Sequence, residues 1–327
     1  MSVVLTKSRC INALRCCWNY VLSRFGLVRI SHMPLFVSVE PAAVCQLRCP
    51  ECPVGQAKTA PLTEHRPDSP DRIQTNVWER VLSESAPYAH TMQFYFQGEP
   101  LLNRDLPRMI AEAHQAGLYT IVSTNAQAMT PEMAQALVQA GLDRIIVSMD
   151  GLSEESYQAY RVGGSLERCK AAIRYLREAK LKNKNYELKI ELQCLRLRTN
   201  EHELERFRRE YKRLGADRLV FKTAQLYNYR NGHPLIPTNL RYSRYIQGTD
   251  GLWHRRPLGK GCWRVWSGVV VTTGGDVLPC CYDKAHAHAY GNIKEKSLRD
   301  LFANDRARTF RHSALQQQPE ICQECYQ

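Results

Sequence analysis

The sequence predicts an α/β fold in which a parallel sheet is followed by a small C-terminal domain with a β-hairpin and a helix. Between residues 34 and about 223, short apolar runs of β character alternate with stretches of helical character. About six such strand–helix units are too few to close an eight-stranded barrel. Residues 262–327 are rich in loops and contain spaced cysteines, which is typical of a small domain held together by metal.

The strand and helix signals follow one another regularly along this central region. The expected strands cover residues 35–40, 92–96, 118–123, 144–149, 187–195 and 218–221. The expected helices cover residues 106–116, 131–140, 166–181 and 201–214. Pro131 marks a helix start, and Gly117, Gly141 and Gly215 mark helix ends. Since the strands are parallel, we expect their C-terminal ends, and any site built on them, to lie along one rim.

Three segments lie outside this alternation. Residues 1–33 predict an amphipathic helix, which we expect to pack on the central domain; contact with a membrane surface is the less favoured alternative. Residues 57–72 predict a loop, and residues 224–261 predict a linker or a loop that faces the substrate. We expect the cysteines of the first segment to be buried free thiols: Cys10, Cys16 and Cys17.

Composition limits the classes of protein. The chain of 327 residues has a formal net charge of +13, but glutamates are interleaved with its densest basic run at 204–213, which favours a solvated helix face over nucleic-acid binding. Thirteen cysteines are an odd number, and no cleavable signal is evident at the N-terminus. We therefore expect a reducing cytoplasm, and an anaerobic setting if the cysteines hold oxygen-labile clusters.

Three closely spaced cysteines directly follow the first expected strand. Cys45, Cys49 and Cys52 have the spacing C-x3-C-x2-C. Three thiolates are one fewer than a four-iron cluster normally takes, so one iron would remain open to a small molecule with donor atoms. A zinc knuckle or a group of inert buried thiols is the competing interpretation.

The cysteine spacing resembles that of the radical S-adenosylmethionine (SAM) superfamily. Polar residues at three later strand ends agree with this resemblance: Gly98-Glu99, Thr124-Asn125 and Ser148-Met149-Asp150. The resemblance implies a partial (β/α)6 TIM barrel whose open side admits a bulky substrate. It also implies that the three cysteines act in catalysis by binding a 4Fe-4S cluster, with SAM on the open iron.

The same resemblance implies roles for residues around SAM. Gly98 would allow a close approach of the backbone, and Glu99 would hold the SAM ammonium group. Ser148, Asp150 and Arg161 would contact the ribose and carboxylate of SAM. Glu51 stands where the family usually has an aromatic residue against adenine, so the resemblance does not say how adenine is held.

A second set of cysteines surrounds a hairpin expected at 265–271 and 277–278. Its members are Cys262, Cys280, Cys322 and Cys325. A structural zinc site would use the same residue types. The arrangement resembles the twitch domain, a shortened SPASM domain, which implies an auxiliary 4Fe-4S cluster closed by four cysteines. Cys281 competes with Cys280 for one of these positions.

The combined resemblance implies an enzyme of the oxidoreductase or maturase type. Such an enzyme reductively cleaves SAM to a 5′-deoxyadenosyl radical and abstracts hydrogen from its substrate, while the auxiliary cluster takes up an electron. Modification of a peptide or protein is the main expectation, and dehydrogenation of a small alcohol or aminocyclitol is the alternative. A function as a non-catalytic iron-sulfur electron carrier is a third and less favoured alternative. The expected electron donor is a flavodoxin- or ferredoxin-type protein.

Overall fold

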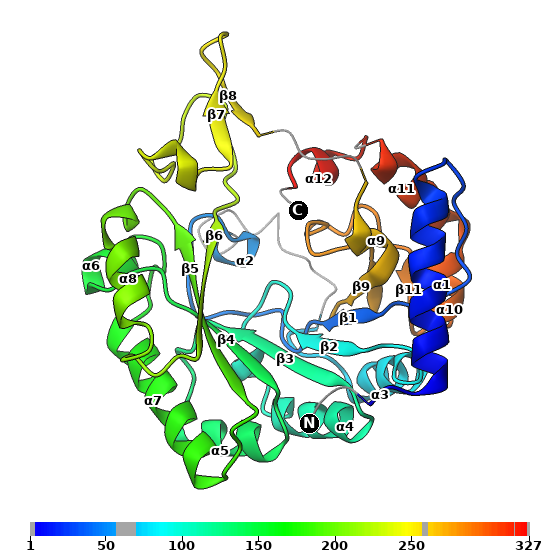
Figure 1. The fold of residues 1–327 in the computed structure, drawn as a ribbon, viewed down its shortest axis with the longest axis horizontal. Coiled ribbons are helices and arrows are strands. Elements are labelled where there is room, and N and C mark those ends of the chain that lie inside the picture. The colour runs from blue at the N-terminus through cyan, green and yellow to red at the C-terminus, as the bar shows by residue number, and fades with distance from the viewer. Residues whose placement is uncertain (1–3, 57–69, 257–260, 317, 326–327) are drawn as a thin grey trace.

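The computed structural model describes residues 4–56, 70–256, 261–316 and 318–325, and it confirms the partial parallel barrel (Figure 1). Six strands pair in parallel in the order of the chain. They are β1 (Phe36–Val39), β2 (Thr91–Phe94), β3 (Tyr119–Thr124), β4 (Arg144–Ser148), β5 (Lys189–Arg196) and β6 (Arg218–Thr223). All six lie within two residues of the expected boundaries, because each is a short run rich in β-branched and apolar side chains. These side chains are largely buried in β1 to β5 and only partly buried in β6.

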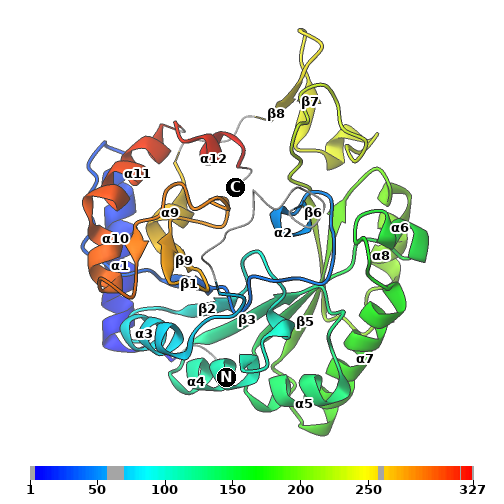
Figure 2. The ribbon, with the colours of Figure 1, turned by 180° about the vertical axis from the view of Figure 1, so that it is seen from behind.

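Helices cover the outer face of these strands (Figure 2). They are α3 (Thr75–Ser85), α4 (Leu106–Gln115), α5 (Pro131–Gln139), α6 (Glu154–Gln158), α7 (Leu166–Lys182) and α8 (Leu204–Glu210). The predicted start of α5 is confirmed, since the Thr130 side chain accepts a hydrogen bond from the Met133 amide. The expected helix at 201–214 is shorter: a 3-10 turn, η3 (Glu201–Glu203), precedes α8. A further 3-10 turn, η2 (Pro100–Leu102), follows β2.

The C-terminal segment extends the same sheet instead of forming a separate one. It contains α9 (Trp263–Ser267), β9 (Gly268–Val271), β10 (Asp276–Leu278), β11 (Gly291–Asn292), α10 (Leu298–Ala303), α11 (Asp305–Leu315) and α12 (Glu320–Gln323). Strand β9 pairs in parallel with β1 and antiparallel with β10, so one sheet runs β11-β10-β9-β1-β2-β3-β4-β5-β6. The two cysteine-bearing regions are thereby joined through β1.

The expected hairpin is present, but its first strand is shorter than predicted. Residues Val265 to Ser267 belong to helix α9, and the strand begins at Gly268. The carbonyl groups of Val265 and Trp266 accept hydrogen bonds from the side chains of Arg311 and His32, so they are not available to a neighbouring strand.

The segment predicted as a linker has structure of its own. It contains η4 (Leu240–Tyr242) and an antiparallel pair of strands, β7 (Tyr245–Gln247) and β8 (Trp253–Arg255), which lie beyond the end of β6 in Figure 1. The loop expected at 57–72 falls outside the described residues, except for 70–72. A short helix, α2 (Pro53–Gln56), directly follows the first cysteine set.

The N-terminal helix α1 (Lys7–Ser23) packs on the domain through polar side chains. The buried guanidinium of Arg9 donates hydrogen bonds to the carbonyl oxygens of Ala86 and Ala116, which end helices α3 and α4. A cation at these positions also interacts favourably with both helix dipoles. Cys16 is buried as expected, whereas Cys10 and Cys17 are exposed, because they lie away from this polar face.

No helix in the described part of the chain is both long enough and apolar enough to cross a membrane.

The buried side chain of His32, which contacts α1 and α9, makes the stability of this packing depend on pH. The ring of His32 lies between the Asn19 side-chain amide, 2.8 Å from Nδ1, and the Trp266 carbonyl oxygen, 2.8 Å from Nε2. A neutral ring serves both partners, accepting at one nitrogen and donating at the other. Burial lowers the pKa of His32 from 6.5 to about 4.

We expect acidification to destabilise the protein through this histidine. Between pH 6.5 and 4 the unfolded state binds more protons than the folded state, so stability falls as the pH decreases. The free energy of unfolding should decrease by about 2 kcal/mol from pH 7 to pH 5 through His32 alone. Urea unfolding of wild type and His32→Gln measures this difference. An equal pH dependence in the two proteins would contradict the prediction.

Candidate functional site

The first cysteine set lies in a loop between β1 and α2. Cys49 is buried, and Cys45 and Cys52 are partly buried. Helix α2 approaches this loop closely, because a Cβ atom on Gly55 would lie 2.4 Å from the Cys49 carbonyl oxygen. Burial raises the pKa of Cys45 to about 11, and a hydrogen bond from the Leu47 amide opposes this shift. The charges of Cys49 and Cys52 also act on Cys45, so the three thiols are neighbours.

Gly98 joins the end of β2 to the segment that leads into the cysteine loop. A Cβ atom at Gly98 would lie 2.0 Å from the Ala42 carbonyl oxygen, which no side chain tolerates. The next amide, that of Glu99, donates to the Val44 carbonyl oxygen at 2.8 Å. The close approach expected for Gly98 is therefore made to the backbone just before Cys45.

The buried Glu99 carboxylate is oriented by three donors. One oxygen accepts from the Thr124 hydroxyl at 2.5 Å and from the Leu101 amide at 3.1 Å. The other accepts from the Asn125 amide at 2.8 Å. Burial raises the pKa of Glu99, and these hydrogen bonds oppose the shift. Because a carboxylate offers about four acceptor positions, one remains for an ammonium group.

Asn125 was not among the residues selected from the sequence. Its side-chain amide donates to the Cys45 sulfur at 3.3 Å, and its oxygen accepts from Gln46 at 3.1 Å. Since its backbone amide also holds Glu99, Asn125 connects the end of β3 with both the carboxylate and the cysteine loop. The strand-end pattern Thr124-Asn125 was the only signal of this role in the sequence.

Asp150 and Arg161 form a buried ion pair at the end of β4. The Arg161 Nε atom lies 2.6 Å from one Asp150 oxygen, and the other oxygen accepts from the Leu195 amide at 2.6 Å. Burial alone would lower the pKa of Arg161, but the charges of Asp150 and Cys49 raise it well above its usual value. Both Asp150 oxygens are thus engaged, while Arg161 also faces the cysteine loop. Ser148 is the last residue of β4 and is mostly buried.

Glu51 connects the cysteine loop with the segment after β6. One of its carboxylate oxygens accepts from the Tyr227 amide at 2.6 Å, and the other lies 3.3 Å from His233 Nε2. The carboxylate where the family usually has an aromatic residue therefore anchors the 227–233 segment beside the first cysteine set. No local pattern in the sequence indicates this long-range contact.

The second cysteine set brings together three distant parts of the chain. Cys262 precedes α9, Cys280 follows β10, and Cys322 and Cys325 lie in and after α12. Burial raises the pKa of Cys322 to about 12, and the charges of Cys262 and Cys325 raise it further. Cys280 is likewise next to Cys262 and Cys325. The four expected ligands are therefore neighbours.

Cys281 has a different main neighbour. After burial, its charge is the largest influence on the pKa of Arg264, and it raises that pKa. The Arg264 Nη1 atom lies 4.0 Å from the Cys281 sulfur. The charge of Cys281 raises the pKa of Cys280, so the two side chains are close, and the charges of Cys262 and Cys325 raise the pKa of Cys280 further.

The two cysteine sets suit iron-sulfur clusters, whose ligands are cysteine thiolates. Within the described ranges, no group of three or more His, Cys, Asp or Glu side chains could hold a metal ion. A four-iron cube distributes its thiolates over different irons, so its ligands need not gather around one atom. One set of three cysteines, with Cys49 near Arg161, and one set of four, with Cys262 and Cys280 near Arg264, suit a cluster with one open iron and a closed one.

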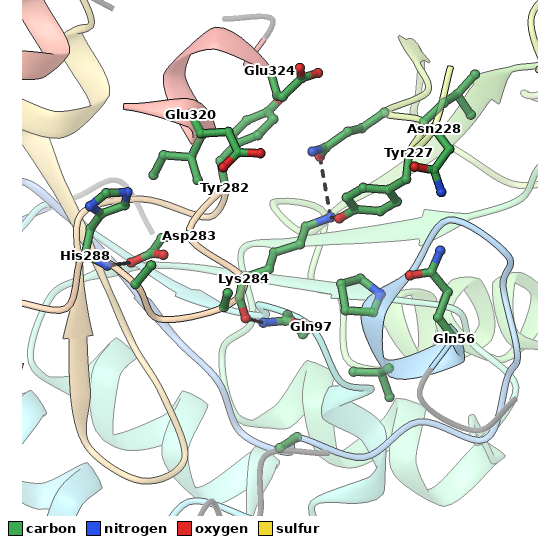
Figure 3. Close-up of a pocket in the computed structure, with 18 of the residues that line it drawn as sticks. Gln56, Gln97, Tyr227, Asn228, Tyr282, Asp283, Lys284, His288, Glu320 and Glu324 are labelled. Atoms are coloured by element: carbon green, nitrogen blue, oxygen red, sulfur yellow. Dashed lines mark hydrogen bonds between the residues drawn. The ribbon is translucent and has the colours of Figure 1, made fainter. Parts of the chain in front are cut away.

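A cavity of about 1020 Å³ lies between these parts of the molecule (Figure 3). Its lining includes Cys45 from the first cysteine loop, Tyr227 from the segment after β6, and Glu324 beside the last cysteines. Lys284 connects two walls, since its ammonium group donates to the Tyr227 hydroxyl at 3.2 Å and to Gln225 at 3.4 Å. The cavity thus adjoins the first cysteine set and the C-terminal domain.

Comparison with known proteins identifies the class. A family model of the radical SAM superfamily matches residues 39–192, and a model of the SPASM iron-sulfur cluster-binding domain matches residues 262–326. The chain belongs to the radical SAM superfamily and carries a SPASM domain. It is an enzyme whose cofactors are a 4Fe-4S cluster and SAM, with auxiliary iron-sulfur in its C-terminal domain.

The individual relatives described here share about a quarter or less of their sequence with this chain. The PqqA peptide cyclase of Ruegeria pomeroyi is 26% identical over 312 residues, covering 89% of this chain and 79% of that protein. The structure of BtrN in complex with AdoMet and 2-DOIA has a TM-score of 0.56 at 18% identity, covering 91% of this chain and 95% of BtrN. The structure of Streptococcus suis SuiB bound to its precursor peptide SuiA has a TM-score of 0.63 at 15% identity. The match covers 91% of this chain and 70% of SuiB. The structural likenesses show a shared fold.

The geometry of Glu99 predicts a specific effect on SAM binding. Glu99→Gln keeps the side-chain shape but removes the negative charge, so an ammonium group loses a charge-assisted hydrogen bond. We expect the Kd for SAM to rise at least about tenfold, while the iron content stays unchanged. Isothermal titration of anaerobically reconstituted protein measures the Kd. Unchanged SAM affinity in Glu99→Gln would exclude Glu99 as the ammonium ligand.

Proposed function

We propose that this enzyme modifies a peptide or protein by radical chemistry started at Cys45, Cys49 and Cys52. One observation carries the proposal: the cavity that Cys45 lines is also lined by the C-terminal domain, so one chamber adjoins both cysteine sets. When bound, the cluster and SAM supply a one-electron cleavage that yields methionine and a 5′-deoxyadenosyl radical. The chain's own residues hold SAM, position the substrate and limit the access of water.

The residues divide into two groups around this chamber. Glu99 holds the SAM ammonium group and Arg161 its carboxylate, while Gly98 lets the backbone approach. Asp150 acts on SAM mainly by fixing Arg161, because both of its oxygens are engaged, and Ser148 lies at the same rim. The auxiliary cluster takes its four thiolates from Cys262, Cys280, Cys322 and Cys325.

A peptide is the substrate class that the cavity and the relatives favour. The cavity volume is at the upper end of the range for small-ligand sites, so it has room for a substrate beside SAM. Tyrosine rings and charged groups of both signs line it, including Tyr229, Tyr282, Arg230 and Glu320. The curated relatives that span most of this chain are named peptide cyclases. Removal of an electron from the substrate radical is assigned to the C-terminal cluster.

Dehydrogenation of a small alcohol or aminocyclitol is the second candidate. It is supported by the likeness to BtrN, whose fold this chain covers over 95% of its length. Either reaction requires a low-potential electron for the first cluster, and a flavodoxin- or ferredoxin-type protein is the proposed donor. A non-catalytic electron carrier does not explain why Glu99 and Arg161 are arranged next to the three-cysteine loop.

The substrate class can be tested through SAM cleavage. Reduced, reconstituted protein should release 5′-deoxyadenosine slowly alone and at least about tenfold faster with a peptide encoded beside its gene. The peptide should lose hydrogen, as mass spectrometry measures. Lys284→Met, which removes an ammonium group from the cavity wall, should raise the KM for that peptide without changing the iron content.

Two results would contradict this proposal in different ways. Acceleration by an aminocyclitol but not by peptides would establish the second candidate. If protein with a full iron content released no 5′-deoxyadenosine, the cysteine loop could not be the place where the radical chemistry starts. Cys45→Ala serves as the control, because it should release none while it still folds around the C-terminal cluster.

A further inference from the structure

Helix α1 presents an unusual distribution of side chains. The side chains that it buries are mainly polar: Arg9, Asn12, Cys16, Asn19 and Ser23. The side chains on its opposite face are apolar and exposed, Ile11, Leu14, Trp18 and Val21, and the exposed Phe25 follows in the turn directly after the helix. These five recur at intervals of three and four residues, which places them in one stripe along the helix and the turn after it. The apolar face of α1 is therefore turned away from the protein.

This stripe is the main concentration of exposed apolar side chains in the described part of the chain. Of the fourteen large hydrophobic residues that are exposed there, eight lie between Val4 and Leu27. Leu14 is 71% exposed, Trp18 62% and Phe25 77%. In Figure 1, α1 lies at the outer edge of the molecule, away from the barrel opening. Exposed apolar patches of this kind typically mark contact surfaces.

The orientation of the helix is fixed by buried hydrogen bonds. Besides the contacts of Arg9 with the ends of α3 and α4, Asn12 donates to the Met33 carbonyl oxygen at 3.0 Å. Asn19 donates to Ser31 at 3.0 Å and contacts His32. Rotating α1 to bury its apolar stripe would leave these polar groups without partners, which is costly. The outward apolar face is thus a stable property of the fold.

The charges around the stripe indicate what covers it. Exposed basic side chains occur on the helix and in the segment that follows it: Lys7, Arg15, Arg24 and Arg29. No acidic residue occurs before Glu40, and Glu40 is buried. Two copies of this segment packed through the same face would therefore bring like charges together, because the segment has no acidic side chain of its own to pair with them. An apolar stripe with Trp and Phe between basic residues matches the interface of an anionic lipid bilayer.

We propose that α1 is a preformed membrane-surface helix that docks this enzyme on anionic lipid. The stripe Ile11, Leu14, Trp18, Val21 and Phe25 would enter the boundary between headgroups and acyl chains. The basic residues beside it would contact lipid phosphates. Because the polar face is already bonded to the domain, the helix needs no rearrangement to bind. The barrel opening would remain accessible, since α1 lies on the outer side of the molecule (Figure 1).

Flotation of the reconstituted holoenzyme with lipid vesicles tests this proposal. The protein should float with vesicles of phosphatidylcholine mixed with phosphatidylglycerol, float less with phosphatidylcholine alone, and bind more weakly as salt is added. The double variant Trp18→Ser/Phe25→Ser should lower the partition coefficient at least about tenfold. The double variant Lys7→Glu/Arg15→Glu should have a similar effect on the mixed vesicles only.

Matched control variants separate this effect from general changes of the surface. Leu181→Ser/Tyr186→Ser removes two apolar side chains that are 54% and 63% exposed at another site, and Arg209→Glu/Arg213→Glu reverses two exposed charges on and after α8. Both controls should float like wild type. All variants should keep the wild-type iron content and melting temperature.

Three outcomes would overturn the proposal. Wild-type protein could fail to float with the mixed vesicles at low salt. The controls could lower flotation as much as the α1 variants. Finally, analytical ultracentrifugation could show a dimer that Trp18→Ser/Phe25→Ser dissociates, which would assign the stripe to a second copy of this chain.

Discussion

Strand β1 is paired on both sides, with β2 on one edge and β9 on the other, and the site depends on this double pairing. The C-terminal end of β1 leads into the first cysteine loop, and the end of β2 carries Gly98 and Glu99. The hairpin of β9 and β10 leads to Cys280. Because β2 is parallel to β1, Glu99 lies at the same edge as the first cysteine loop, while antiparallel β10 runs back from this edge toward Cys280. Residues far apart in sequence thereby line one cavity. A shift of β1 by one residue would turn its side chains to the opposite face and move the cysteine loop.

Buried polar contacts then position the chemistry at this edge. Gly98 permits a backbone approach that no other residue allows, and Asn125 joins the Glu99 carboxylate to the Cys45 sulfur. Each cysteine set also has an arginine beside it: Arg161 at the first and Arg264 at the second. A nearby cation favours thiolates over thiols, and thiolates are the form that binds iron. The same kind of electrostatic support therefore occurs at both cysteine sets.

The sequence predicted the parallel strands well, because each is a short apolar run with β-branched residues bounded by turn signals. The first cysteine set is indicated by its spacing and the second by its resemblance to the twitch domain, and the assignment of these cysteines as cluster ligands stays a prediction. The sequence could not predict the contact of Glu51 with Tyr227 and His233, which joins residues 176 or more positions apart without a local pattern. Helix α1 shows a second limit. Its periodicity predicts an amphipathic helix. Which face is buried, however, depends on the hydrogen bonds that Arg9 donates to the carbonyl groups at the ends of α3 and α4.

The central claim is that one protein holds an open cluster at Cys45, Cys49 and Cys52 and a closed cluster at the C-terminal cysteines. Electron paramagnetic resonance of the reduced protein, recorded with and without SAM, tests this claim most directly. The comparison is between wild type and a variant in which Cys45, Cys49 and Cys52 are all changed to Ala. We predict two cluster signals in wild type, of which SAM alters one, and only the SAM-insensitive signal in the triple variant. A wild-type spectrum that SAM leaves unchanged, or a triple variant that retains the SAM-sensitive signal, would contradict the account.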